Sequence, residues 1–71
     1  MTDIRKVKIY DEYITLAQFL KIVDLISSGG EAKDFILLNK IFINDIEENR
    51  RGRKLYKGDL IKISSKEYEI C

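Results

Sequence analysis

The sequence predicts an α+β fold in which two short helices pack on a small, mostly antiparallel sheet. Apolar residues alternate with polar ones near the start of the chain and again after residue 40, which is the period of half-buried strands. Between residues 15 and 39 they recur instead at steps of three and four, the period of amphipathic helices. The 71 residues include no Pro, no internal repeat and no linker-like stretch, so we expect a single domain spanning residues 1–71. A strand, two helices and then several short strands are typical of the α+β class.

The first strand and the first helix lie in the N-terminal third of the chain. Residues 4–10 alternate apolar and polar side chains and are expected to form a strand. Thr15 then begins a T-x-x-Q pattern with Gln18, a capping box in which each side chain satisfies a backbone donor at a helix start. The helix should end near Ser27. The apolar stripe by which it packs consists of Leu16, Phe19, Leu20, Val23 and Ile26.

The second helix is expected to follow almost at once. Ser28 and Glu31 repeat the capping pattern, and the helix should run to about Asn39. Because so few residues separate the two helices, they must form a compact helical hairpin or a bent pair. The second apolar stripe consists of Ala32, Phe35 and Ile36.

After residue 40 the period changes to two, which indicates short strands joined by turns. Asn44 and Asp45 both tolerate positive φ and are suited to a tight hairpin turn. Further turns are expected at residues 57–59, around Gly58, and at residues 65–66. The expected strands are residues 41–43, 46–49, 60–63 and 67–70.

The net charge of +1 conceals a strong segregation of charge along the chain. Residues 50–57 contain five cations and no acid, whereas the other residues hold eight Lys or Arg against twelve Asp or Glu, a net charge of −4. The chain is therefore expected to carry one concentrated positive patch. Its cations are Arg50, Arg51, Arg53, Lys54 and Lys57.

The stretch from Arg50 to Lys54 is the strongest candidate for a binding site. Four cations in five residues repel one another unless a polyanion joins them, and the planar guanidinium of Arg donates two parallel hydrogen bonds to a phosphate. Gly52 would let the backbone approach the anion closely. Because exposed cations contribute little to stability, replacing Arg51 or Arg53 by Ala should leave folding almost unchanged. The alternative is a solvated loop balanced by the acids just upstream, Asp45, Glu47 and Glu48.

A second candidate is the start of the second helix. The backbone of Ser28, Gly29 and Gly30 could receive a phosphate oxygen there, with Lys33 one turn further on. The alternative is that the two glycines only end one helix and begin the next. If both candidates are right, the cations of residues 50–54 should share one exposed face with Lys33.

Tyrosines are a third, weaker signal for nucleic acid. Tyr56 lies beside the basic stretch and could stack on an unpaired base, whereas Tyr10, Tyr13 and Tyr68 are less well placed. The alternative is that the aromatic residues of so small a protein belong to its core.

Several other functions are excluded by composition. Without His, and with a lone Cys at position 71, the chain offers no zinc site and no disulfide, and we expect neither metal nor cofactor. Glu47 and Glu48 are adjacent and would point to opposite faces of a strand, and no nucleophile, base and oxyanion site can be assembled, so we expect no enzyme. The chain has no apolar run of membrane-spanning length, and Met1-Thr2-Asp3 does not open a signal peptide, so we expect a cytoplasmic protein.

The motifs also match a known family. The order of elements, with Ile43-Asn44 after the second helix and Gly58-Asp59 before the next strand, resembles the RNA-binding domain first seen in ribosomal protein S-four, also called the alpha-L motif. The resemblance is closer to the stand-alone YaaA/YbcJ group of that superfamily, and it covers residues 14–63 as a core motif. The segments that carry it are Ile14-Thr15-Leu16, Gln18-Phe19-Leu20-Lys21, Ser28-Gly29-Gly30-Glu31-Ala32-Lys33 and Asn49-Arg50-Arg51-Gly52-Arg53-Lys54-Leu55.

The resemblance implies a monomeric, non-catalytic RNA-binding protein. Its paired helices and the following basic loop would dock on the phosphate backbone of structured RNA of the ribosomal or transfer RNA class, with the ribosome as a candidate partner and no membrane. The remaining alternative is a protein-interaction module whose basic loop binds an acidic partner in translation or replication.

Overall fold

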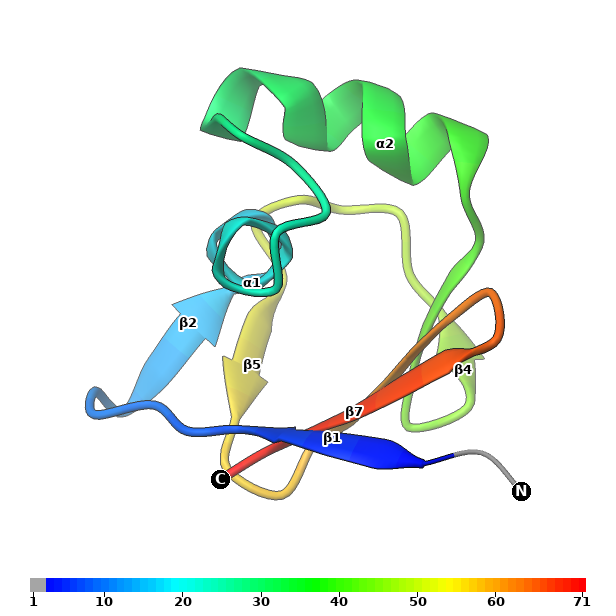
Figure 1. Ribbon diagram of the computed structural model, residues 1–71. Helices are drawn as coiled ribbons and strands as arrows, with labels where there is room; N and C mark the ends of the chain where they lie inside the picture. The colour runs from blue at the N-terminus through cyan, green and yellow to red at the C-terminus, as the bar shows by residue number, and fades with distance from the viewer. Residues whose placement is uncertain (1–2) are drawn as a thin grey trace.

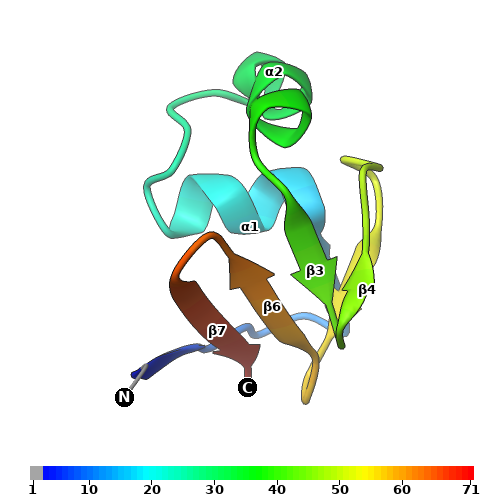
Figure 2. The same ribbon diagram turned by 90° about the vertical axis from the view of Figure 1, so that its right-hand side faces the viewer.

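Within residues 3–71 the main sheet has five strands in the order β1-β7-β6-β3-β4, and only the β1–β7 pair is parallel (Figures 1 and 2). The computed structural model describes residues 3–71 of the chain. Met1 and Thr2 lie outside the described residues. Both belong to the expected domain of residues 1–71 and to the N-terminal segment on which the expected cytoplasmic location rests. The expectation of a mostly antiparallel sheet in an α+β fold is confirmed. The strands are β1 (Ile4–Val7), β3 (Ile41–Ile43), β4 (Ile46–Glu47), β6 (Leu60–Ile63) and β7 (Lys66–Ile70).

A separate two-stranded sheet joins β2 (Tyr13–Thr15) to β5 (Lys54–Tyr56). The sequence pattern did not predict either strand, because each has only three residues and lies inside a stretch with a stronger signal, the capping box or the basic run. Ile14 and Leu55 are partners in the register, and both side chains are buried. This small sheet therefore contributes its inner face to the core and fixes the C-terminal end of the basic stretch.

Helix α1 (Leu16–Ile22) begins where the capping box predicted. The backbone N–H of Thr15 donates to Gln18 Oε1 at 2.8 Å, and that of Gln18 donates to Thr15 Oγ1 at 3.2 Å. The predicted end near residue 27 is wrong, since the chain turns at Asp24, whose φ of 61° is incompatible with a continuing right-handed helix. The stripe residues beyond the helix, Val23 and Ile26, are nevertheless buried.

The second helix consists of a 3-10 turn, η1 (Gly29–Glu31), and α2 (Ala32–Leu38). The Glu31 carboxylate accepts hydrogen bonds from the backbone N–H groups of Ser27 and Ser28, which confirms the capping role predicted for this acid. In Figure 1, α1 is seen end-on and α2 side-on, and Figure 2 shows α1 between the sheet and α2. The helices of residues 3–71 are all too short or too polar to cross a membrane.

The core lies between α1 and the inner faces of the two sheets. Phe19 of α1 is fully buried and meets Tyr68 of β7 edge to face, with 5.2 Å between ring centroids. Such contacts of large side chains supply most of the stabilisation available to a chain of this size. The largest fully buried side chains are Phe19, Leu16, Leu20, Ile41, Ile43, Leu55, Ile61 and Ile70.

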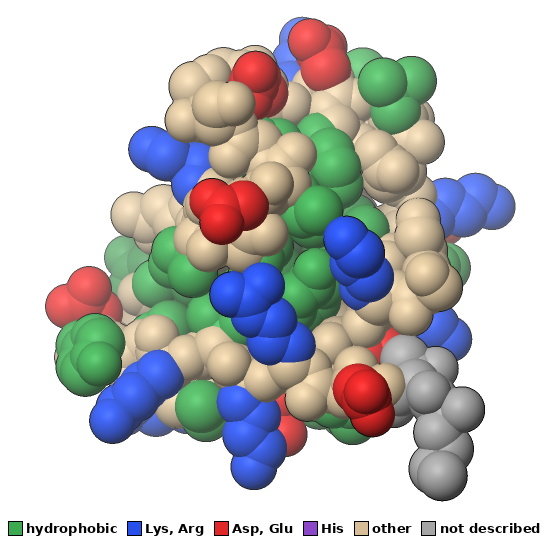
Figure 3. Space-filling model, viewed as in Figure 1, with side chains coloured by type: hydrophobic (Ala, Val, Ile, Leu, Met, Phe, Trp, Pro, Cys, Tyr) green, Lys and Arg blue, Asp and Glu red, His purple; other side chains and the backbone are tan. Residues whose placement is uncertain are grey.

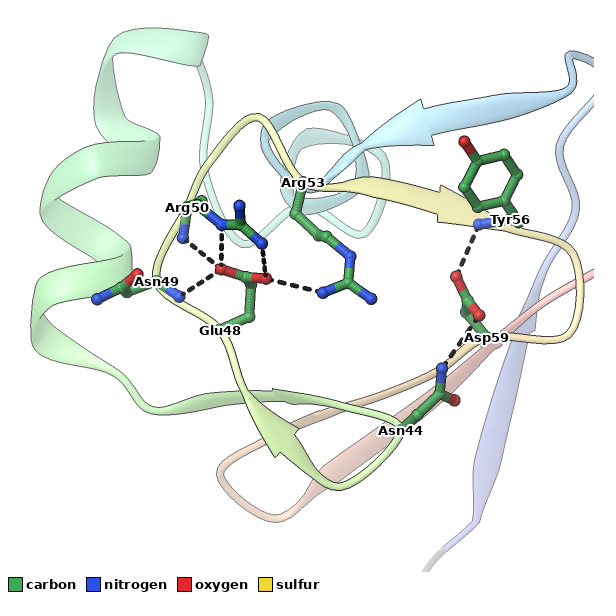
Figure 4. Close-up of polar contacts among 7 residues, drawn as sticks. All are labelled: Asn44, Glu48, Asn49, Arg50, Arg53, Tyr56 and Asp59. Carbon is green, nitrogen blue, oxygen red and sulfur yellow. Dashed lines mark hydrogen bonds and ion pairs between the residues drawn. The ribbon is translucent and has the colours of Figure 1, made fainter.

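Two turns bring β5 and the β3–β4 hairpin together. The predicted turn at Asn44 and Asp45 is confirmed, with φ of 52° and 69°. Asn44 Nδ2 donates to Asp59 Oδ1 at 3.1 Å, and Asp59 Oδ2 accepts from the backbone N–H of Tyr56 at 2.8 Å (Figure 4). The backbone N–H of Leu60 donates to Asn44 Oδ1 at 3.0 Å. These bonds hold the C-terminal end of the positively charged segment against the β3–β4 turn.

Candidate nucleic-acid interface

Residues 48–53 connect β4 to β5 and are called the basic loop below. The loop begins at a buried acid, Glu48, which is 7% exposed. Its carboxylate accepts from the backbone N–H groups of Asn49 and Arg50, both at 3.1 Å, from Arg50 Nε at 3.0 Å and Nη2 at 3.1 Å, and from Arg53 Nη1 at 2.8 Å (Figure 4). The loop therefore folds around one carboxylate.

The Glu48 carboxylate is ionised at neutral pH. The Arg50 guanidinium that hydrogen-bonds it, with help from Arg53, lowers its pKa to about 2, against the opposing effect of burial. Since an ionised carboxylate accepts charge-assisted hydrogen bonds, the two arginines are held firmly to it.

The start of α1 holds the backbone of the same loop. The N–H of Leu16 donates to the carbonyl of Arg53 at 2.8 Å, and the N–H of Ala17 donates to the carbonyl of Arg51 at 3.0 Å. These helix donors have no partner within the helix, so the loop satisfies them. Because the carbonyls of Arg51 and Arg53 are used inside the molecule, the loop cannot move away from α1 without leaving N–H groups unpaired.

Cations gather on both sides of the basic loop. Lys33 of α2 and Arg51 of the loop line one shallow groove, together with Ile36, Leu37 and Asn49. Lys33 and Arg51 therefore share a face of the molecule as expected, whereas the sharing of that face by Arg50, Arg53 and Lys54 stays a prediction. A second groove is lined by Arg50, Gly52, Arg53, Lys54 and Tyr56. The five cations of these grooves form what we call the cationic surface: Lys33, Arg50, Arg51, Arg53 and Lys54.

The opposite side of the molecule carries acids among its cations. On the face seen in Figure 3, Lys and Arg side chains are interspersed with Asp and Glu. The basic loop lies behind α1 in that view and in front of it in Figure 4.

The start of the second helix is less open to an anion than predicted. The N–H of Ser28 is bonded to the Glu31 carboxylate, and the N–H of Glu31 donates to the carbonyl of Ser28 at 3.1 Å. These two hydrogen bonds leave fewer free N–H donors for an anion. The hydrogen bonds that the Glu31 carboxylate accepts from the backbone of Ser27 and Ser28 also lower its pKa. Gly29 and Gly30 are exposed, and a Cβ added at either would meet no atom closer than 3.9 Å. Their backbone is thus open to a ligand, although the negative Glu31 lies beside it.

Of two other predicted contacts, Lys57 lies away from the basic loop, whereas Tyr56 lies at the surface beside it. Lys57 lies in the turn after β5, at the opposite end of that strand from the basic loop. Tyr56 is 43% exposed, so it is not a core residue. Tyr68 is buried, in agreement with the alternative that aromatic residues belong to the core.

The surroundings of Arg53 bear on the stability expected for its substitution. Arg53 is only 34% exposed, and its guanidinium bonds to the buried Glu48. Replacing it by Ala would leave a buried carboxylate oxygen with fewer donors, which destabilises a protein. The contact with Glu48 therefore favours destabilisation by Arg53→Ala, against the expectation from the sequence, and we expect unchanged folding only for Arg51→Ala, because Arg51 is exposed.

Sequence reasoning treated Glu48 only as a balancing charge. The prediction that Glu47 and Glu48 point to opposite faces is confirmed, since Glu47 is exposed and Glu48 buried. Which of the two turns inward depends on the register of β4 against β3, where Glu47 pairs with Phe42. The sequence does place a carboxylate two residues before Arg50, close enough along the chain for the two side chains to hydrogen-bond, and this spacing could have predicted the contact.

Comparison with known proteins agrees with this architecture. Residues 7–71 match the family model described as S4 domain. A relative from Bacillus subtilis (strain 168), named "Probable ribosome maturation protein RlbA", is 53% identical over 57 residues, which cover 80% of this chain and 80% of the relative. The resemblance drawn from the capping and basic motifs is thus confirmed. The chain belongs to the S4 domain family, a family of RNA-binding domains.

Proposed function

We propose that this chain is a monomeric, non-catalytic protein that docks its cationic surface on the phosphate backbone of structured RNA. Membership of the S4 domain family supports RNA as the ligand. The observation that carries the proposal is that Lys33 of α2 and Arg51 of the basic loop line one groove, with the other cations in the adjoining one. Phosphate contacts of this kind supply much of the affinity of proteins for nucleic acid.

The hydrogen bonds to Glu48 orient the arginines and still leave donors for RNA. A guanidinium has five N–H donors. Arg50 directs its Nε and one Nη2 donor to Glu48, and Arg53 directs one Nη1 donor. The remaining donors of both side chains can bind phosphate oxygens. Because the side chains are already ordered, less conformational entropy is lost when RNA binds.

Ribosomal RNA is the class of target that we propose. The relative's name contains "ribosome maturation". A domain that recognises the shape of an RNA through the RNA's phosphate backbone also suits a folded ribosomal segment better than a free single strand. We place this activity in the cytoplasm. The other candidate, an acidic protein partner, would also use the charge of the basic loop but would not need the groove between the loop and α2.

The proposal is tested by removing one cation at a time. Arg51→Ala and Lys33→Ala should each weaken binding to a structured ribosomal RNA fragment several-fold and reduce the salt dependence by about one phosphate contact. Lys66→Ala removes an equal charge from the start of β7 and is the control. Filter binding or fluorescence anisotropy gives the affinities. Equal losses for all three variants, or no RNA binding by the wild type, would contradict the proposal.

A further inference from the structure

The outer face of the two-stranded sheet carries an aromatic pair. Tyr13 and Tyr56 are direct partners across β2 and β5, and their ring centroids lie 5.8 Å apart with planes tilted by 50°. Tyr13 is 37% and Tyr56 43% exposed, whereas Ile14 and Leu55 on the inner face are buried. The strand alternation thus assigns two aliphatic residues to the core and both tyrosines to the surface.

A comparison with the other aromatic pair shows that this arrangement is unusual within the molecule. Phe19 and Tyr68 are both buried and contribute their contact to the core. Tyr13 and Tyr56 leave a large part of their apolar surface in water, so burial alone does not account for their position. Surface aromatic residues next to one another are typical of binding sites.

The charges around the pair identify the kind of ligand. Lys54 Nζ lies 4.8 Å from the centroid of the Tyr13 ring, and Tyr56 lines the same groove as Arg50 and Arg53. A flat aromatic surface beside cations matches a nucleotide, whose base stacks while its phosphate binds the cations. An acidic peptide would use the cations but would not need the rings.

The groove also has room for such a ligand. A Cβ added at Gly52 would meet no atom within 4 Å, so no protein side chain covers the backbone there. Because the Lys54 ammonium occupies the region over the Tyr13 ring, Tyr56 is the ring that remains for stacking. Tyr13 and Lys54 then hold Tyr56 and the neighbouring phosphate in place.

We propose that Tyr56, supported by Tyr13 and Lys54, stacks on one unpaired nucleobase of the RNA whose phosphates bind the cationic surface. This inference rests on the proposed function and adds that the RNA segment recognised contains a bulged or flipped nucleotide beside a helical stretch. The protein would therefore distinguish two RNAs of equal charge by a single unpaired base.

Two hairpins of equal length test this inference. One contains a single bulged 2-aminopurine and the other is fully paired with 2-aminopurine in the stem. Wild-type protein should bind the bulged hairpin more tightly and quench its fluorescence by stacking. Tyr56→Ala should lose about 5- to 100-fold in affinity for the bulged hairpin, together with the quenching, and little for the paired one. Tyr56→Phe, which keeps the ring, should stay within about twofold of the wild type.

Tyr10→Ala is the matched control, because Tyr10 is also exposed and has Lys8 Nζ 5.5 Å from its ring but lies in the segment before β2. It should bind both hairpins as the wild type does. If the wild type binds both hairpins equally in a salt-dependent manner and Tyr56→Ala changes neither, the stacking inference fails while the proposed function stands. If the wild type binds neither hairpin, the proposed function fails and the inference with it. Thermal melts of the variants exclude unfolding as the cause of any loss.

Discussion

The carboxylate of Glu48 accepts five hydrogen bonds from three residues of the basic loop, Asn49, Arg50 and Arg53, so it determines the conformation of that loop more than any other single group. A buried acid that is bonded in this way is both a structural and an electrostatic element. It reduces the repulsion among the neighbouring arginines, and it orients two of them without using all of their donors. Cations can thus be concentrated at this site without preventing folding.

Removing the charge of Glu48 should destabilise the protein. Glu48→Gln keeps the size of the side chain but replaces charge-assisted hydrogen bonds by weaker ones and one acceptor oxygen by a donor. We expect a loss of about 1–3 kcal/mol in the free energy of unfolding, measured by urea titration. Glu47→Gln is the control, since Glu47 is the exposed neighbour and should change stability by less than about 0.5 kcal/mol. Equal effects of the two substitutions would show that Glu48 does not organise the loop.

The same carboxylate predicts a pH dependence. The pKa of Glu48 is lowered in the folded protein to about 2 from an ordinary value of 4.5. Its stabilising contribution is therefore fully present above about pH 4.5 and is lost as the pH falls toward 2. The difference in unfolding free energy between wild type and Glu48→Gln should shrink across this interval. A difference that stays constant from pH 6 to pH 2 would contradict the assignment.

Two arginines of the loop should respond differently to the same substitution. Arg53→Ala should destabilise the fold by about 1–3 kcal/mol, because Arg53 is half-buried against Glu48. Arg51→Ala should change stability by less than about 0.5 kcal/mol, because its side chain is exposed. Both should weaken RNA binding. Thermal melts on the two variants decide this, and equal melting temperatures would show that the Arg53 contact contributes nothing.

At the scale of elements, the sequence predicted the start of α1 and the end of α2 near Asn39, but not the end of α1. The capping box of Thr15 and Gln18 involves local side chains with a fixed spacing, so the start of α1 could be predicted from four residues. Its end depends on the left-handed conformation of Asp24. No local sequence motif predicts this turn, which depends on tertiary packing. The apolar stripe was still assigned correctly, because Val23 and Ile26 are buried although they lie in the turn after the helix.

The two-stranded sheet could not be predicted for a similar reason. Strands β2 and β5 have three residues each and come from distant parts of the chain, so their pairing depends on the whole fold. The composition of the candidate site was therefore predicted, but of its arrangement only the shared face of Lys33 and Arg51 was. The sequence indicated the cations and Tyr56, while the central role of Glu48 and the partnership of Tyr13 with Tyr56 required the structure.

The glycines of the turns should separate structural from functional roles. Gly58 has a φ of 97°, so Gly58→Ala should destabilise the β5–β6 turn by about 1–2 kcal/mol. Gly29 has no positive φ, and an added Cβ would meet no atom within 4 Å, so Gly29→Ala should leave stability unchanged or raise it by up to about 1 kcal/mol. Denaturant titrations measure both. If Gly29→Ala nevertheless weakens RNA binding, the backbone at the start of η1 contacts RNA; a large loss of stability instead would mean that this glycine is required by the fold.

At the scale of the whole molecule, the segregation of charge makes the domain electrostatically asymmetric. Residues 50–57 contribute +5 and the rest of the chain −4, so a polyanion is attracted most strongly to the side of the basic loop. Specificity for one RNA must then come from the shape of its backbone and from any unpaired base, since the cationic surface offers few groups that read base edges. Such a domain should prefer folded RNA to an unstructured strand of equal charge.

The salt dependence of RNA binding is the most direct test of the central claim that the cationic surface binds phosphates of structured RNA. If about four of its cations each neutralise one phosphate, log K should fall with log[salt] at a slope of roughly −3, and affinity should drop about 50- to 100-fold between roughly 50 and 200 mM salt. The measurement is a titration of a hairpin-rich ribosomal RNA fragment and of polyuridine of equal length across that range. The account predicts this slope together with tighter binding of the hairpin-rich fragment at every salt concentration. A slope near zero, or equal affinity for the two RNAs, would contradict it.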